Sequence, residues 1–115
     1  MRTIGNTPVD GEVRAVASGA LANGNTVIVN ADGTVSVVGG GNLTSENYIG
    51  IAKGAAADGT SAVVQTGCSI NDAQSGLTAG QDYYVQTDGT LGLTAADPSV
   101  LAGTAVSATK IIVKG

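Results

Sequence analysis

Few residues in this chain have the types and spacing that chemistry needs. The sequence contains no histidine, so the commonest general base and the commonest metal ligand are both missing. Ser107 and Lys110 have the Ser-x-x-Lys spacing of a serine nucleophile with a lysine base, but they lie between two predicted strands and do not open a helix. We therefore expect both side chains to belong to an ordinary turn.

Two further segments contain residue types that bind ions or phosphates in other proteins. Asn30 to Gly33 and its counterpart Gln86 to Gly89 carry oxygen ligands, but a calcium loop needs several more at fixed spacing and a bidentate acid. Gly39-Gly40-Gly41 lacks the lysine and the following helix of a phosphate-binding loop. The sequence favours turns at all three places.

The single cysteine, Cys68, has no partner for an intramolecular disulfide and cannot form a thiolate metal cage by itself. We expect it to be a small apolar residue in or near a strand. Asn42-Leu43-Thr44 matches a glycosylation sequon, but Met1-Arg2 is not followed by the apolar run of a secretion signal. The sequence therefore predicts a protein that is not an enzyme, with no catalytic, metal-binding or cofactor-binding residue.

Charge and hydropathy narrow the range of partners. The net charge is −4, and the five basic residues are scattered along the chain. Binding to nucleic acid requires a concentrated basic face, and a polybasic membrane anchor requires a basic cluster. No segment approaches the roughly 20 apolar residues of a membrane-spanning helix. We expect no direct contact with nucleic acid or with a membrane.

The core must be built from small aliphatic side chains. The sequence has 18 glycines and neither tryptophan nor phenylalanine. Such a core buries little apolar surface per residue, and burial stabilises a fold by roughly 25 cal/mol per Å². Association of folded subunits adds stability, so the composition favours self-association.

A long segment of the sequence occurs twice. Leu21 to Val35 aligns without a gap with Leu77 to Leu91, at a constant offset of 56 positions. A repeat of this length indicates one supersecondary unit used twice around a shared core. The repeated residues are turn formers and strand formers, so the sequence duplicates architecture and not a reactive site.

Turns and strands alternate along the chain. Glu12 to Ala17 alternates polar and apolar residues, and Asp32-Gly33 and Asp88-Gly89 are hairpin signals between strand-like runs. Leu43 to Asn47 and Pro98 to Ala102 are the places where the sequence could form a helical turn. The predicted strands are Glu12–Ala17, Thr26–Val29, Val35–Val38, Asn47–Ala52, Ser61–Thr66, Asp82–Gln86, Thr90–Thr94, Leu101–Val106 and Lys110–Val113.

These signals predict an all-β fold, with turns at intervals of roughly 8–12 residues. We expect a small β-barrel or a β-roll or sandwich with two pseudo-symmetric repeats, about 13–67 and about 68–115, in a single domain. Residues 1–12 are expected to form an extended N-terminal arm, because Met1 to Gly11 shows no apolar period. In the pair Tyr83-Tyr84, one side chain should be in the core and the other should be free for an interface.

Two segments carry a resemblance to a known group of proteins. Ser75 to Leu91 contains Gly-Leu-Thr, Tyr-Tyr-Val and Asp-Gly-Thr-Leu, and it resembles a β module of structural proteins of tailed bacteriophages, in particular phages of marine bacteria and cyanobacteria. Ala102 to Ala105, within Ala102 to Val113, is similar to the C-terminal end of trimeric head decoration (cement) proteins. The resemblance covers roughly residues 13–115 and brings no catalytic residue with it.

The resemblance implies a virion protein that is made in the host cytoplasm and assembled onto the capsid surface. As a decoration protein it would bind the major capsid protein at capsomer junctions as a homotrimer, and its arm would add a strand to a capsid-protein edge. The alternative is a tail-fibre or tail-tip domain that takes part in binding a host receptor. In that case the loops Gly39–Asn42 and Ala96–Ser99 would contact the host surface.

Overall fold

A computed structural model of the chain describes residues 12–67 and 69–113, and within those ranges the regular structure consists of strands without a helix. The all-β class is therefore confirmed. The strands are β1 (Glu12–Val16), β2 (Thr26–Val29), β3 (Val35–Val37), β4 (Tyr48–Ala52), β5 (Ser61–Gln65), β6 (Ile70–Asn71), β7 (Asp82–Val85), β8 (Leu91–Gly92), β9 (Leu101–Ala105) and β10 (Ile111–Val113).

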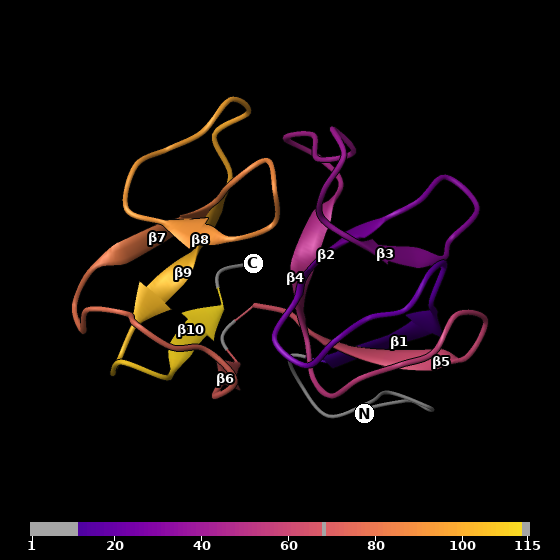
Figure 1. The fold of residues 1–115 in the computed structure, drawn as a ribbon, viewed down its shortest axis with the longest axis horizontal. Coiled ribbons are helices and arrows are strands. Elements are labelled where there is room, and N and C mark those ends of the chain that lie inside the picture. Colours follow the sequence, from indigo (N-terminus) through magenta and orange to yellow (C-terminus); the bar gives the residue numbers. More distant parts are fainter. Residues whose placement is uncertain (1–11, 68, 114–115) are drawn as a thin grey trace, which may run out of the picture.

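The strands form two five-stranded antiparallel sheets that lie side by side (Figure 1). The first has the order β1-β5-β4-β2-β3 and the second has the order β6-β10-β9-β7-β8. Adding five to each strand number of the first sheet gives the order of the second. We call the two halves repeat one (residues 12–67) and repeat two (residues 69–113).

The match between the repeats extends to individual hydrogen bonds. The Asn30 amide donates to the Thr34 carbonyl at 2.7 Å, and the Gln86 amide donates to the Thr90 carbonyl at 2.8 Å. The strand register shifts between Val27 and Ile28 in repeat one, and between the residues 56 positions later in repeat two. The sequence repeat is therefore a structural repeat, as the gap-free alignment predicted.

One glycine in each repeat is required by the register shift. Val27 pairs with Gly50, and Tyr83 pairs with Gly103. A Cβ atom on Gly50 would overlap the carbonyl oxygen of Gln65, and a Cβ atom on Gly103 would overlap the carbonyl oxygen of Ile112. These two glycines let the backbones of neighbouring strands approach closely.

Repeat one closes into a small barrel. Its sheet curls until Ala17, which follows edge strand β1, forms a parallel bridge with Val35 of the other edge strand, β3. The Ser18 amide donates to the Val35 carbonyl at 2.7 Å. The core inside is made of aliphatic side chains, as the composition predicted: Ala17, Leu21, Val27, Val35, Ala52, Ala62 and Val64.

Repeat two does not close in this way. The residues that correspond to Ala17 and Val35 are Ala73 and Leu91, and these two residues do not form a bridge. Its core contains Tyr83, Ala105, Ile111 and Val113, together with Ile51 from strand β4 of repeat one. A residue of the first repeat therefore completes the core of the second.

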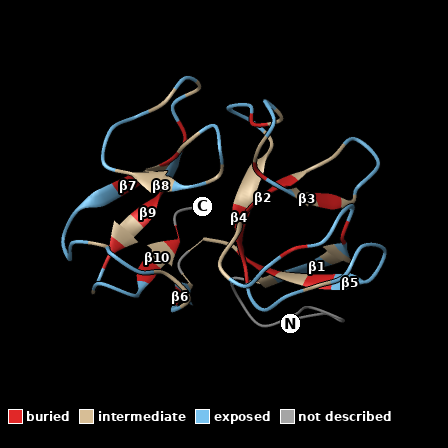
Figure 2. Cartoon of the chain, in the orientation of Figure 1, coloured by how far each residue is buried: buried red, intermediate tan, exposed pale blue. Residues whose placement is uncertain are grey.

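A further cluster joins the repeats. It combines Ile28, Val38 and Leu43 of repeat one with Val85, Val100 and Ala102 of repeat two. Figure 2 shows that buried positions follow the strands, whereas most connecting loops are exposed. The part of the outer side of the first sheet formed by β2 and β4 is thus covered by repeat two.

Several details differ from the sequence predictions. Strand β6 was not predicted, and β8 covers only Leu91–Gly92 of the predicted Thr90–Thr94. The suggested helical turns are absent, since residues 45–47 form a plain turn and Leu101–Ala102 belong to β9. Strand β1 begins at Glu12, as the predicted strand Glu12–Ala17 does, so the arm that was bounded at residue 12 can extend only to Gly11. The rest of that arm and Cys68 lie outside the described residues.

Candidate functional site at the seam between the repeats

The residues with catalytic spacing are engaged in a turn. Ser107 and Lys110 lie in the connection between β9 and β10, where the Ser107 amide donates to the Lys110 carbonyl at 3.3 Å. The Ser107 hydroxyl accepts a bond from the Thr109 amide at 3.3 Å, and Lys110 is exposed. This arrangement agrees with the turn that the sequence favours.

In each Asp-Gly segment, the aspartate side chain bonds within its own hairpin turn. Asp32 accepts bonds from the hydroxyl of Thr34 at 2.6 Å and from its amide at 3.1 Å. Asp88 and Thr90 repeat this arrangement at 2.6 and 3.0 Å. The hydroxyl bond, followed by the amide bond, lowers the pKa of each carboxyl below its ordinary value. Among residues 12–67 and 69–113, no three His, Cys, Asp or Glu side chains come together to hold a metal ion.

The glycine-rich loop is organised by the asparagine of the sequon. The Asn42 carboxamide oxygen accepts a bond from the Gly39 amide at 2.9 Å. Its nitrogen donates to the Val37 carbonyl at 3.0 Å. Asn42 therefore stabilises the loop after β3.

The two tyrosines of repeat two face opposite sides of the second sheet, as the strand period predicted. Tyr83 is buried in the core, where its hydroxyl accepts a bond from the Thr78 amide at 2.8 Å. Tyr84 is half-buried on the other side. It pairs with Leu101 of β9, which is 37% exposed.

The sequence did not indicate Tyr48. Its hydroxyl is buried and has no hydrogen-bond partner within the described chain. Burial raises the pKa of this phenol above its ordinary value. The strand pattern places Tyr48 in β4, but the burial of its hydroxyl depends on packing against the cluster between the repeats.

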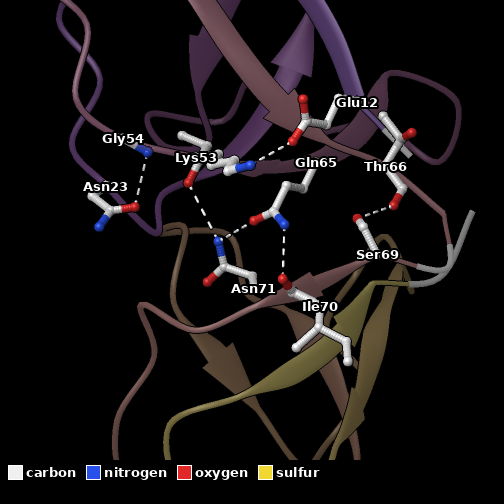
Figure 3. Close-up of polar contacts among 10 residues, drawn as sticks. Glu12, Asn23, Lys53, Gly54, Gln65, Thr66, Ser69, Ile70 and Asn71 are labelled. Atoms are coloured by element: carbon white, nitrogen blue, oxygen red, sulfur yellow. Dashed lines mark hydrogen bonds and ion pairs between the residues drawn. The ribbon is translucent and has the colours of Figure 1, made fainter. Parts of the chain in front are cut away.

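Amide side chains join the repeats where the chain passes from one to the other (Figure 3). The Asn71 side chain, which is 1% exposed, donates to the Gln65 side-chain oxygen at 2.8 Å and to the Ala52 carbonyl at 3.4 Å. The Gln65 side chain donates to the Ile70 carbonyl at 2.7 Å. These bonds satisfy polar groups that would otherwise be buried at a cost.

A second pair of bonds crosses the same boundary. The Gln74 side chain donates to the Gly24 carbonyl across the boundary at 3.1 Å, and within repeat two it also donates to the Asn71 side-chain oxygen at 3.0 Å. The Thr26 hydroxyl donates to the Gly89 carbonyl at 2.8 Å. The boundary between the repeats is thus fixed at both edges of the second sheet.

A cavity of about 340 Å³ lies at this boundary. Its wall combines a turn of repeat one with two segments of repeat two, and it contains no charged side chain. The lining residues are Gly24, Asn25, Thr26, Ala73, Gln74, Ser75, Gly76, Leu77, Tyr83, Gly89, Thr90 and Leu91. Its amides, hydroxyls and backbone groups suit an uncharged hydrogen-bonding ligand. This cavity could not be predicted from the sequence, because its lining comes from three segments that are far apart in the chain.

Large apolar side chains are exposed on repeat two as well as on repeat one. Those of repeat two are Ile70, Leu93, Leu101 and Val106, and those of repeat one are Val13, Val16 and Val37. Ile70 is 51% exposed and pairs with Ile112 of β10 on the outer side of the second sheet. We call Ile70, Tyr84, Leu101 and Ile112 the outer face.

The chain matches no protein-family model and no curated protein. Within the described residues, no helix is both long and apolar enough to cross a membrane.

Proposed function

We propose that this chain is a structural protein of a tailed-bacteriophage virion. In this proposal it is a capsid decoration protein that binds the outside of the head and stabilises the junctions between capsomers. It associates as a homotrimer, contacts the major capsid protein and performs no catalysis. Ser75 to Leu91 and Ala102 to Val113, which carry the resemblance to such proteins, contain β7, β10, most of β9 and the first residue of β8.

The outer face is the observation that carries the proposal. In repeat one, Ile28 pairs with Tyr48 on the side of the sheet that repeat two covers, and Ile28 is 2% exposed. The corresponding pair in repeat two is Tyr84 with Leu101, and both remain accessible. This side of the first sheet thus packs against protein within the molecule, and the accessibility of the equivalent side of the second sheet supports its assignment as the surface that meets a partner.

Capsids that lack this protein provide the test. We expect the full chain to co-sediment with them, and Ile70→Asp combined with Leu101→Asp to reduce binding at least tenfold, because two added charges would lose hydration where apolar side chains meet the partner. Thr60→Asp, at an exposed position in repeat one, is the matched control and should bind as the wild type does. Circular dichroism verifies that all three proteins are folded.

Two results would count against this proposal. Equal capsid binding by the double variant and the wild type would exclude the outer face, and absence of binding by the wild type would exclude the decoration role. Deleting residues 2–11 tests the predicted arm separately. Loss of capsid binding by a folded deletion variant would support strand addition by the arm, whereas unchanged binding would contradict it.

The second candidate is a receptor-binding domain of a tail fibre or tail tip. It is favoured by the packing of Leu43 and Val100 in one cluster, which holds the loops before them, Gly39–Asn42 and Ala96–Ser99, at the same end of the molecule (Figure 1). Binding of the wild type to host cells but not to capsids would decide for this role.

A further inference from the structure

The contact between Ala17–Ser18 and Val35 closes the barrel of repeat one, and the corresponding contact is not made in repeat two. In repeat one, Ser18 donates its amide to the Val35 carbonyl and the barrel closes. The corresponding residues are Gln74 and Leu91, but the Gln74 amide donates to the Thr109 carbonyl instead, at 3.1 Å. Its side chain is held by the Gly24 carbonyl of repeat one. The Gln74 amide and side chain are thus both bonded elsewhere, and Gln74 and Leu91 both line the cavity.

The backbone amide and carbonyl of Leu91 face the side on which the corresponding contact is made in repeat one. Residue pairs of an antiparallel ladder alternate between bonded and non-bonded. The Gln86 amide donates to the Thr90 carbonyl, so the next pair, Val85 with Leu91, is a non-bonded one. The amide and carbonyl of Leu91 consequently point away from β7, toward the side on which Val35 receives Ser18 in repeat one. Within the described chain, Leu91 has no counterpart of that bond.

The cavity has the properties of a site for a short piece of backbone. Its volume of about 340 Å³ is near the lower end of the range for ligand sites, roughly 300–1,000 Å³. In repeat one the equivalent position holds Ala17, which is 1% exposed, so a small side chain fits there. Because the wall is uncharged, a charged occupant would lose hydration without gaining an ionic partner.

We propose that the cavity binds an extended segment of a partner protein with small, uncharged side chains. The segment runs parallel to β8 and closes the second barrel, as Ala17–Ser18 close the first. One residue donates its amide to the Leu91 carbonyl, and another accepts a bond from the Leu91 amide. This inference goes beyond the virion proposal and does not depend on it.

The chain itself supplies the probe. A capped peptide with the sequence of residues 15–20, Ala-Val-Ala-Ser-Gly-Ala, is titrated into the full-length protein while its amide NMR signals are recorded. We expect saturable shifts at Gly76 and Leu91 and slower hydrogen exchange at the Leu91 amide. A peptide methylated on the serine nitrogen cannot donate to the Leu91 carbonyl, and should bind about tenfold more weakly.

Two variants test the location. Ser75→Trp places a large side chain on the cavity wall and should abolish the shifts, whereas Ala95→Trp, at an exposed position outside the lining, should leave them unchanged. The proposal is wrong if the peptide causes no shift, if the methylated peptide binds equally well, or if the shifts occur at Val35 in repeat one. Saturable shifts at Leu91 with glucose but not with the peptide would make the cavity a small-molecule site, and would also overturn the proposal.

Discussion

Repeat one and repeat two have the same strand order, the same shift of register and the same Asp-Gly hairpin, but they differ in how their cores are completed. Repeat one forms its core from its own residues and closes with the Ala17–Val35 bridge. The core of repeat two includes Ile51 of repeat one, and repeat two does not form the bridge that corresponds to Ala17–Val35. Near-identical local structure can therefore give two different closures.

Substitutions at matched positions explain the difference. Ala15 of repeat one corresponds to Asn71, whose side chain bonds to Gln65 of repeat one. Ser18 corresponds to Gln74, whose side chain reaches the Gly24 carbonyl. At these two positions repeat two has longer amide side chains that bind repeat one, whereas in repeat one Ala15 pairs with Ala62 of β5 and Ser18 bonds to Val35 of β3.

The largest expected effect concerns the feature that the repeats share. Gly50→Ala and Gly103→Ala each place a Cβ atom against a carbonyl oxygen of the neighbouring strand. Because backbone on both sides must shift, we expect each to lower the free energy of unfolding by about 4 kcal/mol or to prevent folding. Urea unfolding measures the change. Gly39→Ala is the control, since its Cβ would meet no atom within 4 Å, and it should change stability by less than about 0.5 kcal/mol.

The next largest effect is a difference in stability between substitutions at matched positions of the two repeats. Ile51 is 0% exposed and packs in the core of repeat two, whereas its counterpart Thr104 pairs with Asp82 on the outer side of the second sheet. We expect Ile51→Ala to destabilise the protein by about 3 kcal/mol through lost packing and a cavity. Thr104→Ala should cost about 0.5 kcal/mol or less, because it removes an exposed bond to Asp82. Equal costs in urea unfolding would contradict the dependence of repeat two on Ile51.

A smaller effect of opposite sign is expected at Tyr48. Its buried hydroxyl has no partner, so Tyr48→Phe removes a polar group that folding takes out of water. The variant should be more stable than the wild type by about 1 kcal/mol. Leu101→Ala is the comparison in repeat two, and it should cost about 1 kcal/mol because Leu101 is partly exposed. Thermal unfolding of both variants gives the values, and a destabilised Tyr48→Phe would show that the hydroxyl is bonded.

The smallest effect should be equal in the two repeats. Asp32 and Asp88 have pKa values below the ordinary 3.8 in the folded state, chiefly because a threonine hydroxyl donates to each. Each carboxylate therefore contributes stability above pH 3.8, and loses it as the pH falls through the lowered pKa. Asp32→Asn and Asp88→Asn should each make acid unfolding less steep, by similar small amounts. A clear inequality in the urea midpoints between pH 2 and 5 would show that the hairpins differ.

Local chemistry made much of the fold predictable. Asp32-Gly33 and Asp88-Gly89 predicted both hairpins because glycine adopts the positive φ that the turn needs, 87° at Gly33 and 90° at Gly89. Strand β6 was not predictable in this way, since its two residues, Ile70 and Asn71, are too few to show the alternation of polar and apolar residues that marks a strand. Asn71 is polar yet buried, and only its bonds across the repeats explain that position.

The cavity was not predictable for a related reason. Its walls come from Gly24 to Thr26, Ala73 to Leu77 and Gly89 to Leu91, with Tyr83 between them. In the sequence these segments read as turns, because the residues that form them favour turns in isolation. Two such segments bridge in repeat one and do not in repeat two, where the side chain of Gln74 bonds to the Gly24 carbonyl across the boundary between the repeats.

Native-state hydrogen exchange on the wild type tests the central claim most directly. Matched amides in the two repeats make matched bonds, those of Gly24, Val29 and Ala52 in repeat one and those of Gly80, Val85 and Ala105 in repeat two. Opening of repeat one removes Ile51 from the core of repeat two, whereas repeat two can open while the closed barrel of repeat one persists. We therefore expect each repeat-one amide to be more protected than its repeat-two counterpart. Equal protection of the pairs, or stronger protection in repeat two, would contradict the account.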